Sequence, residues 1–400
     1  RMAAPVGGAG SAGLARPVCL PALPPAPPQR PAETLAALAL VPPLLAILTF
    51  VGLFVEDGEA FLVKRLPGPV ARLLRDAQLT WDLFSLWEFS LAALGAAATR
   101  PVLVQRFLAP GGAAEAAYGP LPSQRLELFV PPAAGPAAPP PLVVFVHGGV
   151  WCHSCAWQYR LVGKRLQAEG FAAAVVGYGL YPAHRVPDMV EHIRLALAWL
   201  RAHGGARGAD ASRVALLGHS SGGHLCALAA LAEGATAIGG AEAGLRAVAT
   251  LSAPFDVATH YEFERRRGVA QMSPLHPANG GEASFAALSP TCLLEKEVAT
   301  GAGLPPFFVG HGLADTTVPP TQAEAFAAAA AANGAAQAEL RLWPGVGHFG
   351  AIAAAMGFRA GEDRARPRGD GMTPSAGRKS DTAAQAWHCR RPAMRGRAAL

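Results

Sequence analysis

Residues 214–225 read Val-Ala-Leu-Leu-Gly-His-Ser-Ser-Gly-Gly-His-Leu, and this stretch decides the fold. The apolar run at 214–217 predicts a buried strand, and the Ala-rich stretch from Ser221 onward predicts a helix. Between them, Gly218-His219-Ser220-Ser221-Gly222 has the G-x-S-x-G form of a nucleophile elbow, a sharp turn that exposes a serine hydroxyl. The glycines remove side chains that would collide there, and the helix N-terminus stabilises negative charge at the serine oxygen. Ser220 is therefore the candidate nucleophile.

Short apolar runs alternate with amphipathic stretches on both sides of this turn. We predict strands at 141–146, 171–178, 214–218, 245–251, 306–309 and 339–343, and helices at 156–168, 188–203, from 221 onward and at 321–332. Strands that are apolar throughout and separated by helices indicate an α/β fold, with a mostly parallel sheet covered by helices on both faces. Because 254–304 is too long for a simple crossover, we expect a small cap there, over the carboxyl edge of the sheet.

A glycine-rich turn, His147-Gly148-Gly149, follows the strand predicted at 141–146. Glycines at such a turn expose backbone N–H groups that no side chain blocks, which is how an oxyanion hole is made. We predict that Gly148 and Gly149 supply donors of this kind, together with the N–H of Ser221. For His147 we expect a structural role, in which its ring fixes the turn through a backbone hydrogen bond.

A serine nucleophile needs a base and an orienting acid, which in this kind of sheet follow the serine in the order Asp, His. Asp315 and His348 have that order, and each lies just past the end of a predicted strand. We predict that Ser220 attacks a carbonyl carbon, His348 takes and returns the proton, and Asp315 holds the imidazole. Asp256, which comes after the preceding strand, is the rival acid. We expect structural roles for three further histidines, His219, His224 and His311.

The composition divides the chain into four segments. Residues 1–32 are rich in Pro, Ala and Gly and are typical of a targeting or linker segment. Residues 33–100 predict a hydrophobic, membrane-associated helical segment, because 34–55 holds 22 residues without a charge, enough to cross a bilayer. A targeting segment or a buried helix is the alternative. Residues 120–356 contain all the motifs above and predict the catalytic domain, and residues 357–400 predict a disordered basic tail.

The net charge of +6 lies wholly in that tail. Residues 357–400 hold ten of the 34 Lys and Arg residues and four of the 28 Asp and Glu residues, so the rest of the chain holds 24 of each. The tail lacks interleaved aromatic residues, and we predict no nucleic-acid partner. We also expect deletion of residues 360–400 to leave catalytic activity intact.

No motif of the chain indicates a bound cofactor. Cys152 and Cys155 form a C-x-x-C pair, but a zinc site would need a second pair, and we interpret these two as incidental loop cysteines. No His, Asp or Glu cluster has metal-ligand spacing, and no G-x-G-x-x-G follows a strand. We therefore predict neither a metal nor a nucleotide cofactor.

At these motifs the sequence resembles the α/β-hydrolase esterase/lipase superfamily, and within it the isoprenylcysteine methylesterase-like branch. The resemblance spans about residues 120–356. Four motifs carry it: HGGVW at 147–151, GHSSGGHL at 218–225, HGLADTTVP at 311–319 and GVGHF at 345–349. A cap-region pattern is more distinctive, with His260-Tyr261-Glu262-Phe263-Glu264, Arg267-Gly268-Val269 and Ser273-Pro274. Val150 stands where many relatives have a third glycine.

The resemblance implies an α/β-hydrolase fold, a triad of Ser220, Asp315 and His348, and an oxyanion hole of Gly148, Gly149 and Ser221. It implies hydrolysis of a carboxylic ester through an acyl-enzyme, the substrate being a small molecule or the methyl ester of a prenylated cysteine. Plant members carry N-terminal membrane segments, which implies an endomembrane location such as the ER or Golgi, with the plastid or cytoplasm as alternatives.

Two alternatives to an ester hydrolase stay open. Kynurenine formamidases share HGG-x-W and GHSxGxHL, so the same residues could hydrolyse a formamide. An apolar cap pocket would favour prenyl or acyl esters, whereas a pocket with a cation would favour an amino-acid formamide. The alternative of another class is a catalytically silent hydrolase-fold scaffold or receptor at a membrane.

Overall fold

The computed structural model describes residues 113–132, 138–232, 245–296, 304–335 and 337–357, together with Gly68, Pro69 and Phe107. The predicted N-terminal segments 1–32 and 33–100, Gly68 and Pro69 apart, lie outside these residues, and so does the basic tail beyond Gly357. Among the described residues, no helix combines the length and apolar character that crossing a bilayer requires. The candidate span at 34–55 is not within that part of the chain.

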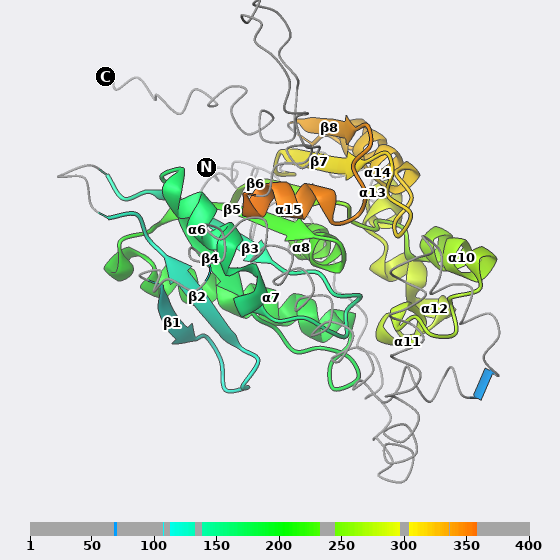
Figure 1. Ribbon diagram of the computed structural model, residues 1–400, viewed down its shortest axis with the longest axis horizontal. Helices are drawn as coiled ribbons and strands as arrows, with labels where there is room; N and C mark the ends of the chain where they lie inside the picture. Colours follow the sequence, from blue (N-terminus) through cyan, green and yellow to red (C-terminus); the bar gives the residue numbers. More distant parts are fainter. Residues whose placement is uncertain are drawn as a thin grey trace, which may run out of the picture.

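An eight-stranded sheet forms the centre of the molecule (Figure 1). Its strand order is β1-β2-β4-β3-β5-β6-β7-β8, with β1 and β2 antiparallel to their neighbours and the six strands from β3 to β8 parallel. The strands are β1 (Ala114–Ala117), β2 (Arg125–Phe129), β3 (Pro141–Val146), β4 (Ala172–Val176), β5 (Asp210–His219), β6 (Leu245–Leu251), β7 (Phe307–Gly312) and β8 (Ala338–Trp343). All six carboxyl ends of the parallel strands therefore meet at one edge of the sheet.

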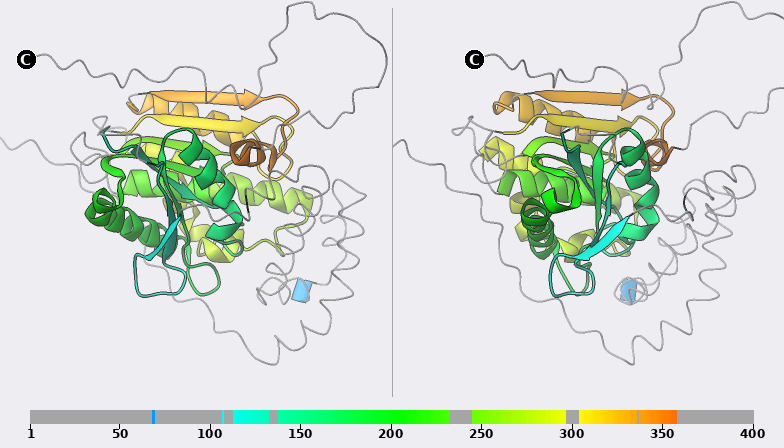
Figure 2. Two further views of the ribbon diagram at one scale, coloured as in Figure 1. Left: turned by 60° about the vertical axis from the view of Figure 1, so that its left-hand side comes forward. Right: turned by 90° about the vertical axis from the view of Figure 1, so that its left-hand side faces the viewer.

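Helices cover both faces of the sheet (Figure 2). Because side chains alternate along a strand, β3 sends Leu142 and Val144 into one apolar cluster and Val143 and Phe145 into the other. The first cluster is completed by α7 (Val186–His203), α8 (Ser221–Ala232), α13 (Pro290–Lys296) and α14 (Thr321–Ala332), and the second by α6 (Arg160–Ala168) and α15 (Gly350–Met356). This confirms the predicted α/β fold with a mostly parallel sheet.

Short helices fill the connection between β6 and β7. They are α10 (Val257–Arg267), α11 (Leu275–Ala278), α12 (Glu282–Phe285) and the 3-10 helix η3 (Ala286–Leu288), followed by α13. Helices α10, α11 and α12 gather beside the sheet, on the side toward which β7 and β8 point (Figure 1). Asp256 caps α10 by accepting hydrogen bonds from the N–H groups of Ala258 and Thr259, and Gly268 ends it with a φ of +78°.

The observed elements match most predicted ones, and the mismatches have local causes. Strand β6 and helix α14 have the predicted bounds, whereas β5 begins four residues early, at Asp210. Strands β1 and β2 and helix α15 were not predicted; for β1 the reason is that Ala114–Ala117 carries no apolar alternation. The sheet thus begins at Ala114, before residue 120, and β3 begins at Pro141, the last residue of the Pro-rich stretch 131–141.

Candidate active site

Ser220 occupies a strained turn between β5 and α8. Its φ of +53° lies in the left-handed region, which costs a non-glycine residue about 1–3 kcal/mol. The Ser220 N–H donates to the Leu251 carbonyl of β6 over 2.8 Å, which holds the turn to the neighbouring strand. Gly222 packs directly on the carbonyls of Val146 and His147, so closely that a side chain there would collide. The local sequence therefore places the serine hydroxyl at the carboxyl edge of the sheet.

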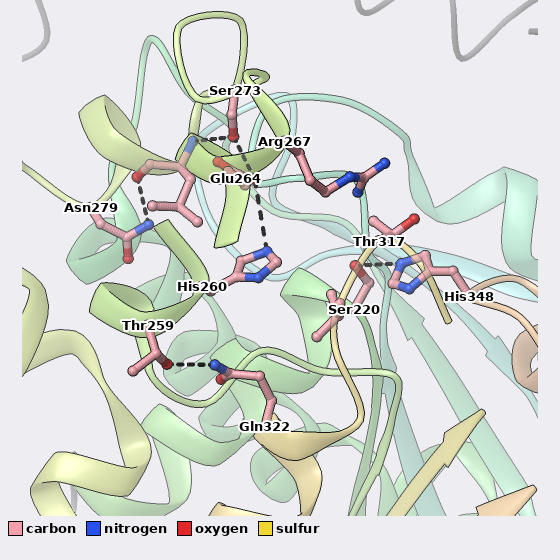
Figure 3. Close-up of polar contacts among 12 residues, drawn as sticks. Ser220, Thr259, His260, Glu264, Arg267, Ser273, Asn279, Thr317, Gln322 and His348 are labelled. Carbon is pink, nitrogen blue, oxygen red and sulfur yellow. Dashed lines mark hydrogen bonds and ion pairs between the residues drawn. The ribbon is translucent and has the colours of Figure 1, made fainter. Parts of the chain in front are cut away.

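His348 and Asp315 lie in line with this hydroxyl. The Ser220 Oγ is 3.0 Å from Nε2 of His348, and Nδ1 of the same ring is 2.8 Å from Oδ2 of Asp315. Figure 3 shows Ser220 and His348 facing each other across the end of the sheet. Asp315 follows β7 and His348 follows β8, so neighbouring parallel strands deliver both side chains to one edge. In this order the imidazole can take a proton from the serine while the carboxylate stabilises the resulting charge.

The Asp315 carboxylate is held in its ionised form. Its Oδ1 accepts hydrogen bonds from the N–H groups of Thr317 and Val318, both over 2.9 Å, and its Oδ2 lies 3.2 Å from Nε2 of His311. Burial by itself would raise the pKa of Asp315, but hydrogen bonds from His311, His348 and the Val318 N–H outweigh it and lower the pKa well below the usual value. The Asp315 carboxylate is therefore charged at every pH at which a protonated His348 would need a negatively charged partner.

The glycine turn after β3 packs directly against the nucleophile. A Cβ on Gly148 would lie 2.8 Å from the His219 carbonyl oxygen and 2.9 Å from the Ser220 Cβ. Gly149 has a φ of +130°, and its carbonyl accepts hydrogen bonds from the N–H groups of Cys152 and His153, both over 3.0 Å. Val150, in place of a third glycine, also has a positive φ, of +50°. The structure thus brings Gly148 beside Ser220 in a tight turn that a larger residue at 148 would disrupt.

The buried histidines around this centre hold the loops in place. His147 Nδ1 lies 2.8 Å from the Gly148 carbonyl, as expected for a structural histidine. His224 accepts from Trp151 Nε1 over 3.2 Å and lies 2.8 Å from the Leu288 carbonyl through Nε2, so it ties α8 to the cap. Burial lowers the pKa of His147 and of His224 to about 4, which keeps both rings neutral near pH 7.

His219 supports the backbone of His348. Its Nε2 lies 3.1 Å from the His348 carbonyl oxygen, and burial together with the neighbouring His348 ring lowers its pKa to about 3. The neutral His219 ring can donate a hydrogen bond from Nε2 to the His348 carbonyl, which holds the backbone of the His348 loop in place. This agrees with the structural role expected for His219.

The structure brings Asp315, and not Asp256, to His348. Asp256 Oδ1 accepts from two N–H groups of α10 over 2.9 and 3.1 Å, so that carboxylate serves as a helix cap. Within the described residues, no three His, Cys, Asp or Glu side chains are grouped to hold a metal ion. Neither Cys152 nor Cys155 is joined in a disulfide bond.

Three polar residues that position the site were given no such role at the sequence level, although Arg267 stands in the cap pattern. The Tyr178 hydroxyl donates to the His147 carbonyl over 2.7 Å, Gln322 Oε1 accepts from the Asp256 N–H over 2.7 Å, and Arg267 donates to the Thr316 carbonyl. Each partner is a backbone group far along the chain, 66 residues away for Gln322. Such contacts leave no local pattern, and only the fold reveals them.

Comparison with known proteins agrees with this geometry. The family model BD-FAE matches residues 126–329, just over half of the chain. Esterase LipC of Mycobacterium tuberculosis is 32% identical over 245 residues, covering 58% of this chain and 58% of its own. The "Probable isoprenylcysteine alpha-carbonyl methylesterase ICMEL1" of Oryza sativa subsp. japonica is 30% identical over 239 residues, covering 58% of this chain and 55% of its own. The chain thus spans little more than half the length of these relatives.

A solved structure shares the fold. Esterase B from Lactobacillus rhamnosis superimposes with a TM-score of 0.51 at 24% sequence identity, covering 67% of this chain and 87% of its own. Its inhibited form gives a TM-score of 0.52 at 23% identity. At this identity the likeness shows the α/β-hydrolase fold and no more.

Proposed function

Since the chain belongs to the BD-FAE family, we propose that it is a serine hydrolase that cleaves carboxylic esters through an acyl-enzyme. One observation carries the proposal: Ser220 Oγ, the His348 ring and the Asp315 carboxylate stand in one line, with contacts of 3.0 and 2.8 Å. The strained φ of +53° at Ser220 supports it, because strain of this kind persists where the surrounding structure enforces it, commonly at active sites.

In the first half of the proposed reaction Ser220 attacks the ester carbonyl. His348 Nε2 takes the hydroxyl proton as the bond forms, and Asp315 stabilises the imidazolium and keeps Nδ1 protonated. The negative charge that develops on the carbonyl oxygen is met by the N–H groups of Gly148, Gly149 and Ser221. Loss of one such donor typically costs on the order of 10²–10³ in rate. His348 then returns the proton to the leaving alcohol.

In the second half a water molecule replaces the alcohol. His348 takes a proton from the water as it attacks the acyl-enzyme, and the acid leaves Ser220 with its hydroxyl restored. The same donors stabilise the second tetrahedral intermediate. No step draws on a metal or cofactor in this proposal.

The methyl ester of a prenylated cysteine is the finer substrate hypothesis. It is supported by the likeness to plant isoprenylcysteine methylesterases at about 30% identity and by the cap pattern from His260 to Ser273. The segment 254–304 would then form the cap over that substrate. Membrane association through residues 34–55 belongs to the same hypothesis, because a prenylated substrate would itself lie at a membrane.

A substrate panel with purified full-length chain tests the proposal. We expect hydrolysis of p-nitrophenyl esters and of a prenylcysteine methyl ester, with Ser220→Ala reduced to near background. Ser212→Ala is the matched control, since Ser212 is an exposed serine at the opposite end of β5. If N-formylkynurenine were the best substrate, the formamidase alternative would replace ester hydrolysis as the proposed function. Folded protein that hydrolyses nothing in the panel would favour the silent scaffold.

A further inference from the structure

A second polar cluster lies in the cap, facing the proposed nucleophile. His260 and Glu264 stand one turn apart on α10 and are 4% and 7% exposed. Ser273, which lies beyond the end of the helix, donates its hydroxyl proton to Glu264 Oε1 over 2.9 Å. In Figure 3 the His260 ring extends from α10 toward Ser220 and His348. The proposed reaction uses neither His260 nor Glu264.

The hydrogen bonds of this cluster are incomplete. His260 Nε2 lies 3.8 Å from Glu264 Oε1. The carboxylate attracts the proton of the neutral ring to this nitrogen. With that proton on Nε2, Nδ1 carries a lone pair and can only accept a hydrogen bond. Within the described part of the chain, neither His260 Nδ1 nor Glu264 Oε2 has a partner, although both atoms are buried. Where Glu264 is ionised, two acceptors thus await a donor, and a buried acceptor without one costs free energy.

The cluster is buried about as deeply as the reacting residues. Burial lowers the pKa of His260 to about 3, and the charge of His348 lowers it further while that of Asp315 raises it. Ser220 and His348 are themselves only 9% and 7% exposed. The two groups are thus similarly buried, and the His260 ring of the cluster points toward Ser220 (Figure 3).

Helix α10 is fixed at both ends, so the cluster has a defined position. At its start, Thr259 Oγ1 accepts a hydrogen bond from Gln322 Nε2 of α14 over 2.6 Å (Figure 3). At its end, Arg267 donates to the carbonyl of Thr316, the residue after Asp315. The same contact couples the cap helix to the loop that orients His348. Such two-ended attachment suits a site that must keep a fixed geometry.

We propose that His260 and Glu264 are specificity-determining residues, which accept hydrogen bonds from a donor group that the substrate carries close to its ester. This inference rests on the proposed ester hydrolysis. The donor it calls for is an N–H or O–H, and an amide or ammonium N–H beside the scissile ester has the required chemistry. Because burial raises the pKa of Glu264 to about 7, an ammonium donor would also draw the carboxylate into its charged form.

Matched ester pairs test the proposal. N-acetylleucine methyl ester is compared with its carba-analogue, in which CH2 replaces the N–H, and leucine methyl ester supplies an ammonium donor. A second pair, 2-acetamidoethyl butyrate and its carba-analogue, carries the donor on the alcohol side. We expect the full-length native chain to prefer the donor-bearing member of at least one pair by about 10- to 100-fold in kcat/KM. In Glu264→Gln and His260→Phe that ratio should fall toward one, mainly through slower turnover of the donor-bearing ester.

Glu262→Gln is the control, since Glu262 lies on the same helix but forms surface ion pairs with Arg265 and Arg266. Equal turnover within both pairs by the native chain overturns the proposal, even if a variant fails to fold. Variants that slow both members of a pair by the same factor also overturn it, because a purely structural role predicts that result. If the native chain hydrolysed no ester at all and Ser220 were unreactive, the proposed function itself would be wrong.

Discussion

Two neighbouring loops, one after β6 and one after β7, each place an aspartate at the carboxyl edge of the sheet, yet the two carboxylates have different tasks. Asp256 immediately precedes helix α10, and its Oδ1 accepts two N–H groups of that helix. Asp315 precedes a turn, whose Thr317 and Val318 N–H groups occupy Oδ1 and leave Oδ2 for His348 and His311. Both carboxylates thus use Oδ1 to cap the segment that follows, and what distinguishes Asp315 is that its Oδ2 also meets the His348 ring.

The largest expected difference between the two loops is in catalysis. Asp315→Asn should lower kcat by about 10³- to 10⁴-fold, because the amide no longer stabilises the imidazolium or the correct tautomer of His348. Asp256→Asn should change kcat by less than about threefold, since asparagine also caps a helix well. Steady-state kinetics on a p-nitrophenyl ester compares the two. If Asp256→Asn were the damaging change and Asp315→Asn silent, the acid would be misassigned.

A smaller effect is expected on the free energy of unfolding, and here the aspartate that matters is Asp256. Asp256→Ala removes the cap of α10 and should lower the free energy of unfolding by about 1 kcal/mol. Urea unfolding monitored by circular dichroism measures this, with Asp256→Asn as the conservative control. An unchanged midpoint for Asp256→Ala would show that the cap contributes nothing, and the contrast between the loops would then rest on Asp315 alone.

The smallest effect is in the acid dependence of stability. The folded-state pKa of Asp315 lies below its unfolded value of 3.8, so its contribution is complete above that pH and is lost as the pH falls through the folded pKa. Between pH 5 and pH 3 the melting temperature of Asp315→Asn should therefore fall less than that of the native chain. Differential scanning fluorimetry in matched buffers detects the difference. An equal or steeper fall in the variant would contradict a lowered pKa at Asp315.

Much of the site was predictable because its residues have local signatures. Ser220 lies in a G-x-S-x-G turn, and Gly148 and His348 lie in or beside glycine-rich turns, each just after an apolar strand. Parallel strands bring their carboxyl ends to one edge, so such signatures predict a meeting of residues 128 positions apart, as for Ser220 and His348.

The rest depends on contacts that no local pattern encodes. Gln322 and Tyr178 bind backbone carbonyls or N–H groups of distant loops, and the short strand at Ala114–Ala117 forms only because β2 offers it an edge. The sequence already favoured Asp315 over its rival Asp256, although both come after strands, and the contact of Asp315 with His348 agrees with that choice. His260 and Glu264 were visible as a cap pattern, but their missing hydrogen-bond donors were visible only after folding.

The central claim is that Ser220 is an activated nucleophile, and covalent labelling tests it most directly. A fluorophosphonate probe reacts with an activated serine and is located by mass spectrometry of the digested chain. We predict one phosphonylated residue, Ser220, in the native protein, with labelling abolished in Ser220→Ala and strongly slowed in His348→Ala. Native, folded protein that takes up no probe, or Ser220→Ala labelled as fully as the native chain, would contradict the account.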